Sequence, residues 1–171
     1  MHEEVGGGVF NALRNATRHG VTGALLSLRG GDLAGDAVAR AVADASVIDL
    51  SVTFIDRTTP SYTALLDAEG ELIAGFADMD LYETCFPKQM RRRSLRDAIS
   101  QADAVLCDAN IPAQALASLA ALADGKPLFG IAISPAKVSR FSIILPQLQC
   151  LFMNVREAQV VTEDSSTNPL T

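Results

Sequence analysis

The chain has 171 residues, 49% hydrophobic and 20% charged, which fits one globular domain that is large enough to bury a core. Its formal net charge of −6 argues against a nucleic-acid-binding protein, and no apolar run approaches the roughly 18 residues of a membrane span. The three cysteines have no metal-ligand spacing, so we expect no metal site, buried free thiols at Cys107 and Cys150, and a cytoplasmic protein.

The first predicted elements are a helix, a strand and a second helix. Residues 9–19 predict a helix that follows three glycines, and the apolar segment 21–28 predicts a strand. Asp32 is placed to cap a helix that runs to about residue 45. Its spacing turns one apolar face inward, made of Leu33, Ala37, Val38, Ala41 and Val42.

Residues 47–77 depart from this alternation of strand and helix. Segments 48–55, 62–66 and 72–76 predict three successive strands, and residues 67–70 form a hairpin turn between the last two. Strands without intervening helices are not typical of simple β-α units. We therefore expect an antiparallel flap or a sheet edge at about 48–77.

Strands and helices alternate again up to residue 162, which is typical of β-α units around a parallel sheet. We expect helices at 94–102, 112–125, 135–145 and from 156 onward, and strands at 104–107, 128–133 and 151–153. The sequence thus predicts one α/β domain over 1–162 and a frayed polar tail over 163–171. The basic run 91–93 is best explained as a solvated helix end.

The start of the first helix suggests a ligand site. Gly7 and Gly8 have no side chains to cover the main-chain N–H groups there, and Asn11 lies one turn further on. An asparagine side chain can both donate and accept hydrogen bonds. This combination suits a polar, hydroxyl-rich ligand over the helix start.

Five motifs, in order along nearly the whole chain, resemble the ribokinase-like (PfkB) carbohydrate kinases, and most closely their pseudouridine kinase-like branch. They are Gly6-Gly7-Gly8 with Asn11, Gly20 and Gly30; the Gly-x-Asp-x-x-Gly segment 30–35; the flap-like segment 59–80; Asp-Ala-Asn-Ile-Pro at 108–112; and Asn154-x-x-Glu157.

This resemblance implies a three-layer α/β/α fold with a mostly parallel sheet and a small β flap, or lid. In that family the helix start holds the substrate, so Gly7, Gly8 and Asn11 would bind a ribose-like ring and Asn110 would add a contact. Asn154 and Glu157 would help organise Mg-ATP. The implied partner is a small sugar or nucleoside, with no nucleic acid and no membrane.

Each of these residues also has a structural alternative. The glycines could form only a tight turn, and Asn11 could be an ordinary polar residue of a first helical turn. Asn110 could cap the helix that follows it, and Asn154 with Glu157 is close to a capping box. Asp32 fits a helix cap better than a ligand contact.

The chain departs from the family pattern in its catalytic part. Members carry a Gly-Ala-Gly-Asp motif whose Asp is the catalytic base, and this motif does not occur here, so no catalytic residue is predicted. Val9 and Leu13 replace small residues of the signature, and Ile131 and Ala132 stand where an Asp-Pro pair is common. We therefore expect a chain truncated at both ends, with an incomplete fold.

Three functions remain open on this basis. The chain could be part of a kinase that transfers phosphate from ATP to a ribose-like hydroxyl, with pseudouridine as the expected substrate, and be inactive alone. It could instead be a non-catalytic sugar-binding or interaction module, or a remnant without function. Truncation would expose apolar surface, so we also expect homo-oligomers through the flap strands or the cut face.

Overall fold

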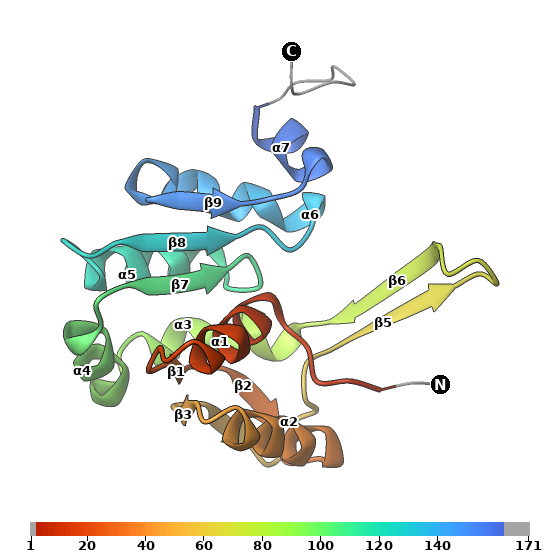
Figure 1. The fold of residues 1–171 in the computed structure, drawn as a ribbon, viewed down its shortest axis with the longest axis horizontal. Coiled ribbons are helices and arrows are strands. Elements are labelled where there is room, and N and C mark those ends of the chain that lie inside the picture. Colours follow the sequence, from red (N-terminus) through yellow and green to blue (C-terminus); the bar gives the residue numbers. More distant parts are fainter. Residues whose placement is uncertain (1–2, 163–171) are drawn as a thin grey trace.

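Parallel strands and their helices make up most of the molecule, and one antiparallel hairpin projects from it (Figure 1). This computed structural model describes residues 3–162, apart from the side chain of Leu72, so the predicted tail at 163–171 lies outside the described residues. The predicted α/β class with a mostly parallel sheet and a small flap is confirmed. No helix in the described part of the chain is long and apolar enough to cross a lipid bilayer.

The N-terminal part contains two helices and four short strands. They are α1 (Gly8–Arg18), β1 (Ala24–Leu25), β2 (Leu28–Gly30), α2 (Leu33–Asp44), β3 (Ile48–Asp49) and β4 (Val52–Phe54). Strand β1 pairs with β3 and β2 with β4, both in parallel. The single strands predicted at 21–28 and 48–55 are therefore each divided into two.

The flap consists of β5 (Ser61–Leu66) and β6 (Leu72–Asp78), which form a two-stranded antiparallel sheet. The turn between them is the predicted one, since Gly70 donates its N–H to the carbonyl of Asp67 and has a φ of +87°. The expected flap range of about 48–77 differs from the structure at its start. Strands β3 and β4 run parallel to β1 and β2 instead of joining the hairpin.

The C-terminal part alternates as predicted and adds a helix that the sequence did not indicate, α3. Its elements are α3 (Asp80–Gln89), α4 (Arg93–Gln101), β7 (Val105–Asp108), α5 (Ala113–Leu122), β8 (Leu128–Ile131), α6 (Pro135–Val138), the 3₁₀ helices η1 (Ser139–Ile143) and η2 (Leu145–Gln147), β9 (Cys150–Phe152) and α7 (Val155–Thr162). Strands β7, β8 and β9 form a parallel sheet in that order.

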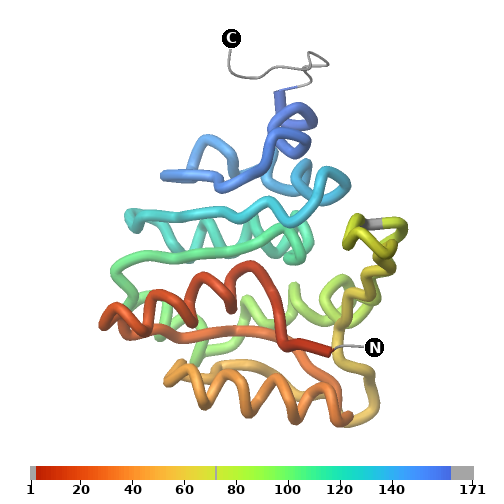
Figure 2. Tube along the Cα trace, turned by 45° about the vertical axis from the view of Figure 1, so that its right-hand side comes forward, coloured from red at the N-terminus to blue at the C-terminus, as the bar shows by residue number. Residues whose placement is uncertain are grey.

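Two clusters of buried side chains form the core. The larger one joins α3, α4 and α5 to β7 and β8, and includes the fully buried Leu116, Cys107 and Phe141. The smaller one, centred on Phe10 and Val42, packs α1 against β1 and α2. Helix α1 thus lies between β7 and α2 in both views (Figure 1 and Figure 2).

Two predictions of burial are wrong. Leu33 is 85% exposed, because it is the first residue of α2 and lies beyond the buried face that Val42 marks. Cys150 in β9 is exposed, whereas Cys107 in β7 belongs to the larger core cluster and is buried as expected. In the structure, Cys85, Cys107 and Cys150 are free thiols.

Candidate functional site

The start of α1 lies against the end of β8. Gly7 has a φ of +116°, which disfavours any residue with a Cβ, and Gly8 follows as the first helical residue. A Cβ on Gly8 would lie only 2.8 Å from Cδ1 of Ile133 and 3.3 Å from Cγ2 of Ile131. The two glycines therefore permit both the turn and the close approach of the helix start to the sheet.

Asp108 connects this helix start to the end of β7. Its carboxylate accepts the main-chain N–H of Asn110 at 2.9 Å, and the main-chain N–H of Val9, at the start of α1, lies near enough to lower its pKa. The residue is 9% exposed, so one buried carboxylate lies beside both the α1 start and Asn110. The structure thus brings Gly7 and Gly8 close to Asn110, at the carboxyl edge of the parallel sheet where ligands commonly bind.

Asn110 is fixed by Lys137 of α6. The Lys137 ammonium donates to Oδ1 of Asn110 at 2.8 Å. Because an ammonium can only donate, this contact orients the amide with its oxygen toward Lys137. Asn110 does not cap the helix that follows, because Pro112 occupies the N-cap position of α5.

Arg140 adds a second cation beside Asn110. Its guanidinium donates to the main-chain carbonyls of Ala109 and Asn110 at 3.3 and 3.2 Å, and to Oε1 of Glu83 at 2.6 Å. Glu83 belongs to α3, so this ion pair ties α3 to the end of β7. We refer to Glu83, Asp108, Asn110, Lys137 and Arg140 as the strand-end cluster.

Burial changes the acidity of two groups in this cluster. Desolvation raises the pKa of the Asp108 carboxyl above its ordinary value, although the N–H groups of Asn110 and Val9 and the charge of Lys137 oppose it. Desolvation also lowers the pKa of Lys137, and the neighbouring Arg140 adds to this effect. Perturbed titrations of this kind are common where a protein binds or transforms a ligand.

Asn11 lies one turn into α1 and is half-buried. Its Oδ1 accepts a hydrogen bond from Arg14 at 3.0 Å, and the Arg14 guanidinium also lies 5.5 Å from the centre of the Phe10 ring. Gly7 is exposed and none of the three predicted helix-start residues is buried in the core. Their surfaces are therefore accessible to a ligand.

The second glycine motif, 30–35, serves a structural purpose. Asp32 caps α2 by accepting the Gly35 N–H at 2.8 Å, and it also accepts the N–H of Thr59 at 2.8 Å and the Thr59 hydroxyl. These bonds, led by the Thr59 hydroxyl, lower the pKa of Asp32 from 3.8 to about 2. Asp32 is thus a helix cap, as the sequence favoured.

Asn154 and Glu157 form a reciprocal capping box at the start of α7. The Asn154 N–H donates to Oε2 of Glu157 at 2.7 Å, and the Glu157 N–H donates to Oδ1 of Asn154 at 2.9 Å. Glu157 is 5% exposed. Among residues 3–162, no three His, Cys, Asp or Glu side chains gather into a metal-binding group.

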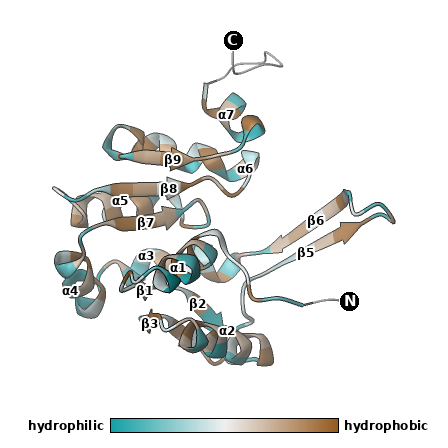
Figure 3. Cartoon of the chain, in the orientation of Figure 1, coloured by the Kyte–Doolittle hydropathy of each residue, from teal (hydrophilic) through white to brown (hydrophobic). Residues whose placement is uncertain are grey.

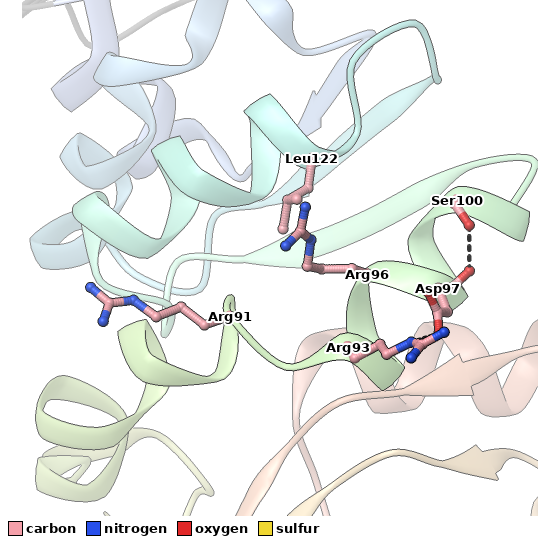
Figure 4. A pocket seen from close by; sticks show the side chains of 6 residues that line it. All are labelled: Arg91, Arg93, Arg96, Asp97, Ser100 and Leu122. Carbon is pink, nitrogen blue, oxygen red and sulfur yellow. Dashed lines mark hydrogen bonds and ion pairs between the residues drawn. The ribbon is translucent and has the colours of Figure 1, made fainter.

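An open hollow lies away from this cluster, beside α4 and the end of α5 (Figure 4). It is lined by Arg91, Arg93, Arg96, Asp97, Ser100 and Leu122. The arginines do not converge, since Arg93 turns toward Asp97 and Arg96 toward Leu122. The Arg93 side chain is 95% exposed and its 3.6 Å ion pair with Asp97 lies on the surface, where such pairs contribute little. Arg91 and Arg93 are exposed, as expected for a solvated helix end, whereas the half-buried Arg92 donates to the carbonyl of Leu50 at 3.1 Å.

Sequence reasoning assigned no site role to four members of the strand-end cluster that the fold brings together, Glu83, Asp108, Lys137 and Arg140. Asp108 had a signal of its own, since it is a charged residue directly after the apolar strand β7. Lys137 and Arg140 had no such signal in the sequence, because they lie 27 or more positions after Asn110 and come close to it only in the folded chain.

No family model matches the chain. A carbohydrate kinase from Agrobacterium tumefaciens superposes with a TM-score of 0.85 at 46% identity, over 94% of this chain and 53% of that chain. Adenosine kinase from Anopheles gambiae, in complex with P1,P4-di(adenosine-5) tetraphosphate, gives a TM-score of 0.80 at 17% identity, over 92% of this chain and 52% of that chain. The chain has a ribokinase-like kinase fold.

A relative that is similar in sequence is also described as a sugar kinase. The uncharacterized sugar kinase YeiI of Escherichia coli (strain K12) is 26% identical to this chain over 174 residues, which cover 98% of this chain and 48% of that protein. Together these similarities relate the chain to proteins described as carbohydrate and sugar kinases. The chain spans about half the length of each of the three proteins.

Proposed function

We propose that the chain is the sugar-binding part of an ATP-dependent sugar or nucleoside kinase, and that its ligand is a ribose-like ring, with pseudouridine as the expected substrate. The observation that carries this proposal is the Asp108 carboxylate, which lies beside both the α1 start and Asn110 at the carboxyl edge of the sheet. Gly7, Gly8 and Asn11 would contact the ring from one side and Asn110 from the other. The cytoplasm, which supplies ATP, is the proposed compartment.

We further propose that these residues alone do not transfer phosphate. Phosphoryl transfer needs a group that accepts or orients the hydroxyl proton, and the Gly-Ala-Gly-Asp motif that provides it in the family does not occur in the sequence. Mg-ATP is accordingly proposed for the whole enzyme. Asn154 and Glu157 remain candidates to help organise it there, but both side chains are engaged at the start of α7.

Calorimetric titration of the chain with ribose, pseudouridine and Mg-ATP tests this function. We expect the two ribose compounds to bind, and Asn11→Ala to weaken them at least roughly 10-fold, since one or more hydrogen bonds to the ring are lost. Asn15→Ala is the matched control, because Asn15 lies on the same helix but is exposed. Absence of ribose binding would overturn the proposal, and ATP-dependent phosphorylation by this chain alone would overturn its second part.

A second candidate function is a binding module that uses sugar without nucleotide. The reciprocal capping of Asn154 and Glu157 favours it, because both side chains already have a structural purpose at the start of α7. In the same titration, a module would bind ribose but show no heat with Mg-ATP. A remnant would bind neither.

The flap is the proposed contact between copies of the chain. All residues of β5 are exposed, and hydrophobic residues run along both strands (Figure 3), with Phe76 65% and Ile73 62% exposed. Water-exposed apolar strands of this kind favour self-association. Sedimentation should show a dimer or larger species that Phe76→Glu dissociates; a monomer at high concentration would contradict this. The free edge of β9 is the alternative contact, and it would leave Phe76→Glu without effect.

A further inference from the structure

Ile133 has a backbone conformation that isoleucine rarely adopts. Its φ is +74°, in the left-handed region, where the branched Cβ comes too close to main-chain atoms. Among residues 3–162, the other residue with a side chain and a positive φ is Ser46. Ser46 follows α2 and donates its N–H to the carbonyl of Ala43, an arrangement that is common at helix ends. Ile133 ends no helix, so its conformation has another cause.

The two neighbours of Ile133 are fixed by the fold. On one side, the Ala132 N–H donates to the carbonyl of Phe152 at 2.9 Å, which holds the end of β8 to β9. On the other side, the Ser134 carbonyl accepts the N–H of Lys137 at 3.0 Å at the start of α6. The change of direction from β8 to α6 therefore falls on residue 133. A glycine would adopt this φ without strain, so what isoleucine adds here is its side chain.

This side chain lies against the start of α1. A Cβ on Gly8 would be 2.8 Å from Cδ1 of Ile133, so the isoleucine occupies the space that a side chain at position 8 would need. Ile133 is nevertheless 37% exposed, and Gly7, which precedes Gly8, is exposed as well. An apolar surface that solvent can reach is therefore present where the proposed ligand would lie.

Other side chains near this place are polar. Asn11 lies one turn into α1, and Asn110 is joined to Lys137 by the 2.8 Å hydrogen bond. A sugar ring carries hydroxyls around its edge and C–H groups on its faces, so a site for it needs an apolar contact besides the polar ones. Strained residues are concentrated at binding and catalytic sites, where the surrounding structure holds them in place. Ile133 has both properties.

We propose that Ile133 is an apolar contact of the ligand, held in a strained conformation so that its side chain covers Gly8 and meets a C–H face of the sugar ring. This inference rests on the proposed function, since it places the ring over the α1 start. The ring would remove the exposed part of Ile133 from water, which favours binding. The hydrogen bonds of Ala132 and Ser134 on either side offset the strain.

Three substitutions at residue 133, titrated with ribose in a calorimeter, separate the side chain from the backbone. Ile133→Ala and Ile133→Gly both remove the contact and should weaken ribose binding to the same extent, roughly 3-fold or more. Ile133→Val keeps most of the apolar surface and should bind ribose within about 2-fold of the unaltered chain. Because alanine keeps the strain and glycine releases it, the glycine variant should unfold at a temperature about 2 °C or more above that of the alanine variant.

Ser46→Ala and Ser46→Gly are the matched control pair. Ser46 also has a positive φ, +56°, but lies after α2. The glycine variant should again unfold at the higher temperature, and neither variant should change ribose binding. Ile48→Ala removes a 54% exposed isoleucine side chain of β3 and should leave ribose binding unchanged as well.

Two outcomes would overturn the inference while the proposed function stands. If ribose binds the unaltered chain and neither Ile133→Ala nor Ile133→Gly weakens it, the side chain does not contact the ring. If Ile133→Ala weakens binding and Ile133→Gly does not, residue 133 acts through its backbone alone. If the unaltered chain does not bind ribose, the proposed function and the inference fail together.

Discussion

Two glycine-rich turns begin consecutive helices in this chain, and they differ in what surrounds their glycines. At α2, a Cβ on Gly30 would lie 2.2 Å from the carbonyl oxygen of Arg57, and one on Gly35 would lie 2.2 Å from the carbonyl of Gly30. At α1, a Cβ on Gly6 would meet nothing within 4 Å, and Gly7 is exposed. The glycines of the α2 turn therefore pack against the main chain, whereas at α1 only Gly8 packs against side chains and Gly6 and Gly7 are open.

The acidic partner of each turn differs in the same way. Asp32 caps its own helix within the turn and joins it to Thr59. The start of α1 has no side-chain cap of its own and lies beside Asp108 of another strand. A turn that is capped by its own aspartate joins structural elements. A turn that is contacted by an aspartate from a strand end keeps its exposed face available for binding.

The largest expected effect comes from Gly30→Ala. The new Cβ would overlap main-chain atoms of residues 57–59, which cannot rotate away as a side chain would. We expect the free energy of unfolding to fall by about 3 kcal/mol or more, or the chain to fail to fold. Urea unfolding followed by circular dichroism measures this. A fall of less than 1 kcal/mol would show that this turn is as open as the one at α1.

Asp108→Ala should have the next largest effect. It removes the acceptor of the Asn110 N–H and a negative charge beside Lys137, both in a buried place. We expect a loss of about 2–3 kcal/mol in unfolding free energy and a loss of ribose binding, since the α1 start and Asn110 lose the carboxylate beside them. Asp97→Ala, on the exposed face of α4, is the control. Unchanged ribose binding by Asp108→Ala would contradict the role of this carboxylate in the site.

The third prediction concerns pH and Thr59→Val. Because the pKa of Asp32 is lowered from 3.8 to about 2 in the folded protein, its stabilising contribution is complete above pH 3.8 and is lost as pH falls toward 2. Removing the Thr59 hydroxyl, the largest cause, should return this pKa toward 3.8 and flatten the pH dependence of unfolding in that window. It should also cost about 1 kcal/mol at neutral pH, since the Gly30 N–H loses its acceptor.

The control for this prediction is Thr58→Val, because Thr58 is the exposed neighbour of Thr59. It should keep the pH dependence of the unaltered chain, measured as urea midpoints between pH 2 and 5. If both variants show the same pH dependence, Thr59 does not set the acidity of Asp32.

The smallest effect is expected for Gly6→Ala, at the open turn. Nothing lies within 4 Å of the new Cβ, so unfolding free energy should change by less than about 0.5 kcal/mol. Thermal unfolding measures this beside Gly30→Ala. A large destabilisation would mean that the α1 turn is as constrained as the α2 turn, and the contrast between them would disappear.

The sequence predicted those parts of the fold that local chemistry determines. Helix α1 begins one residue before the predicted start, Asp32 caps α2, and the 67–70 turn forms with Gly70 at positive φ. The pairing of β3 and β4 was harder to predict, because strands of two or three residues show no hydrophobic period that reveals their partner strand. Parallel pairing with β1 and β2 depends on the tertiary arrangement.

Helix α3 was missed for a different reason. Pro87 lies inside it, and proline normally argues against a helix interior. The burial of Leu81 and Phe86 in the larger core outweighs this local preference. The candidate site shows the same limit of local sequence patterns. Such patterns predicted Gly7, Gly8 and Asn110, whereas Lys137 reaches Asn110 only through the fold.

The two-stranded flap has a consequence for how the protein can be followed in solution. An isolated hairpin is marginally stable in water, and β5 and β6 bond to each other with every side chain of β5 exposed. Their amide protons should therefore exchange with deuterated solvent much sooner than those of β7 and β8, which belong to the packed sheet. Slower exchange in the flap alone would then indicate directly that a ligand or another chain has bound to it.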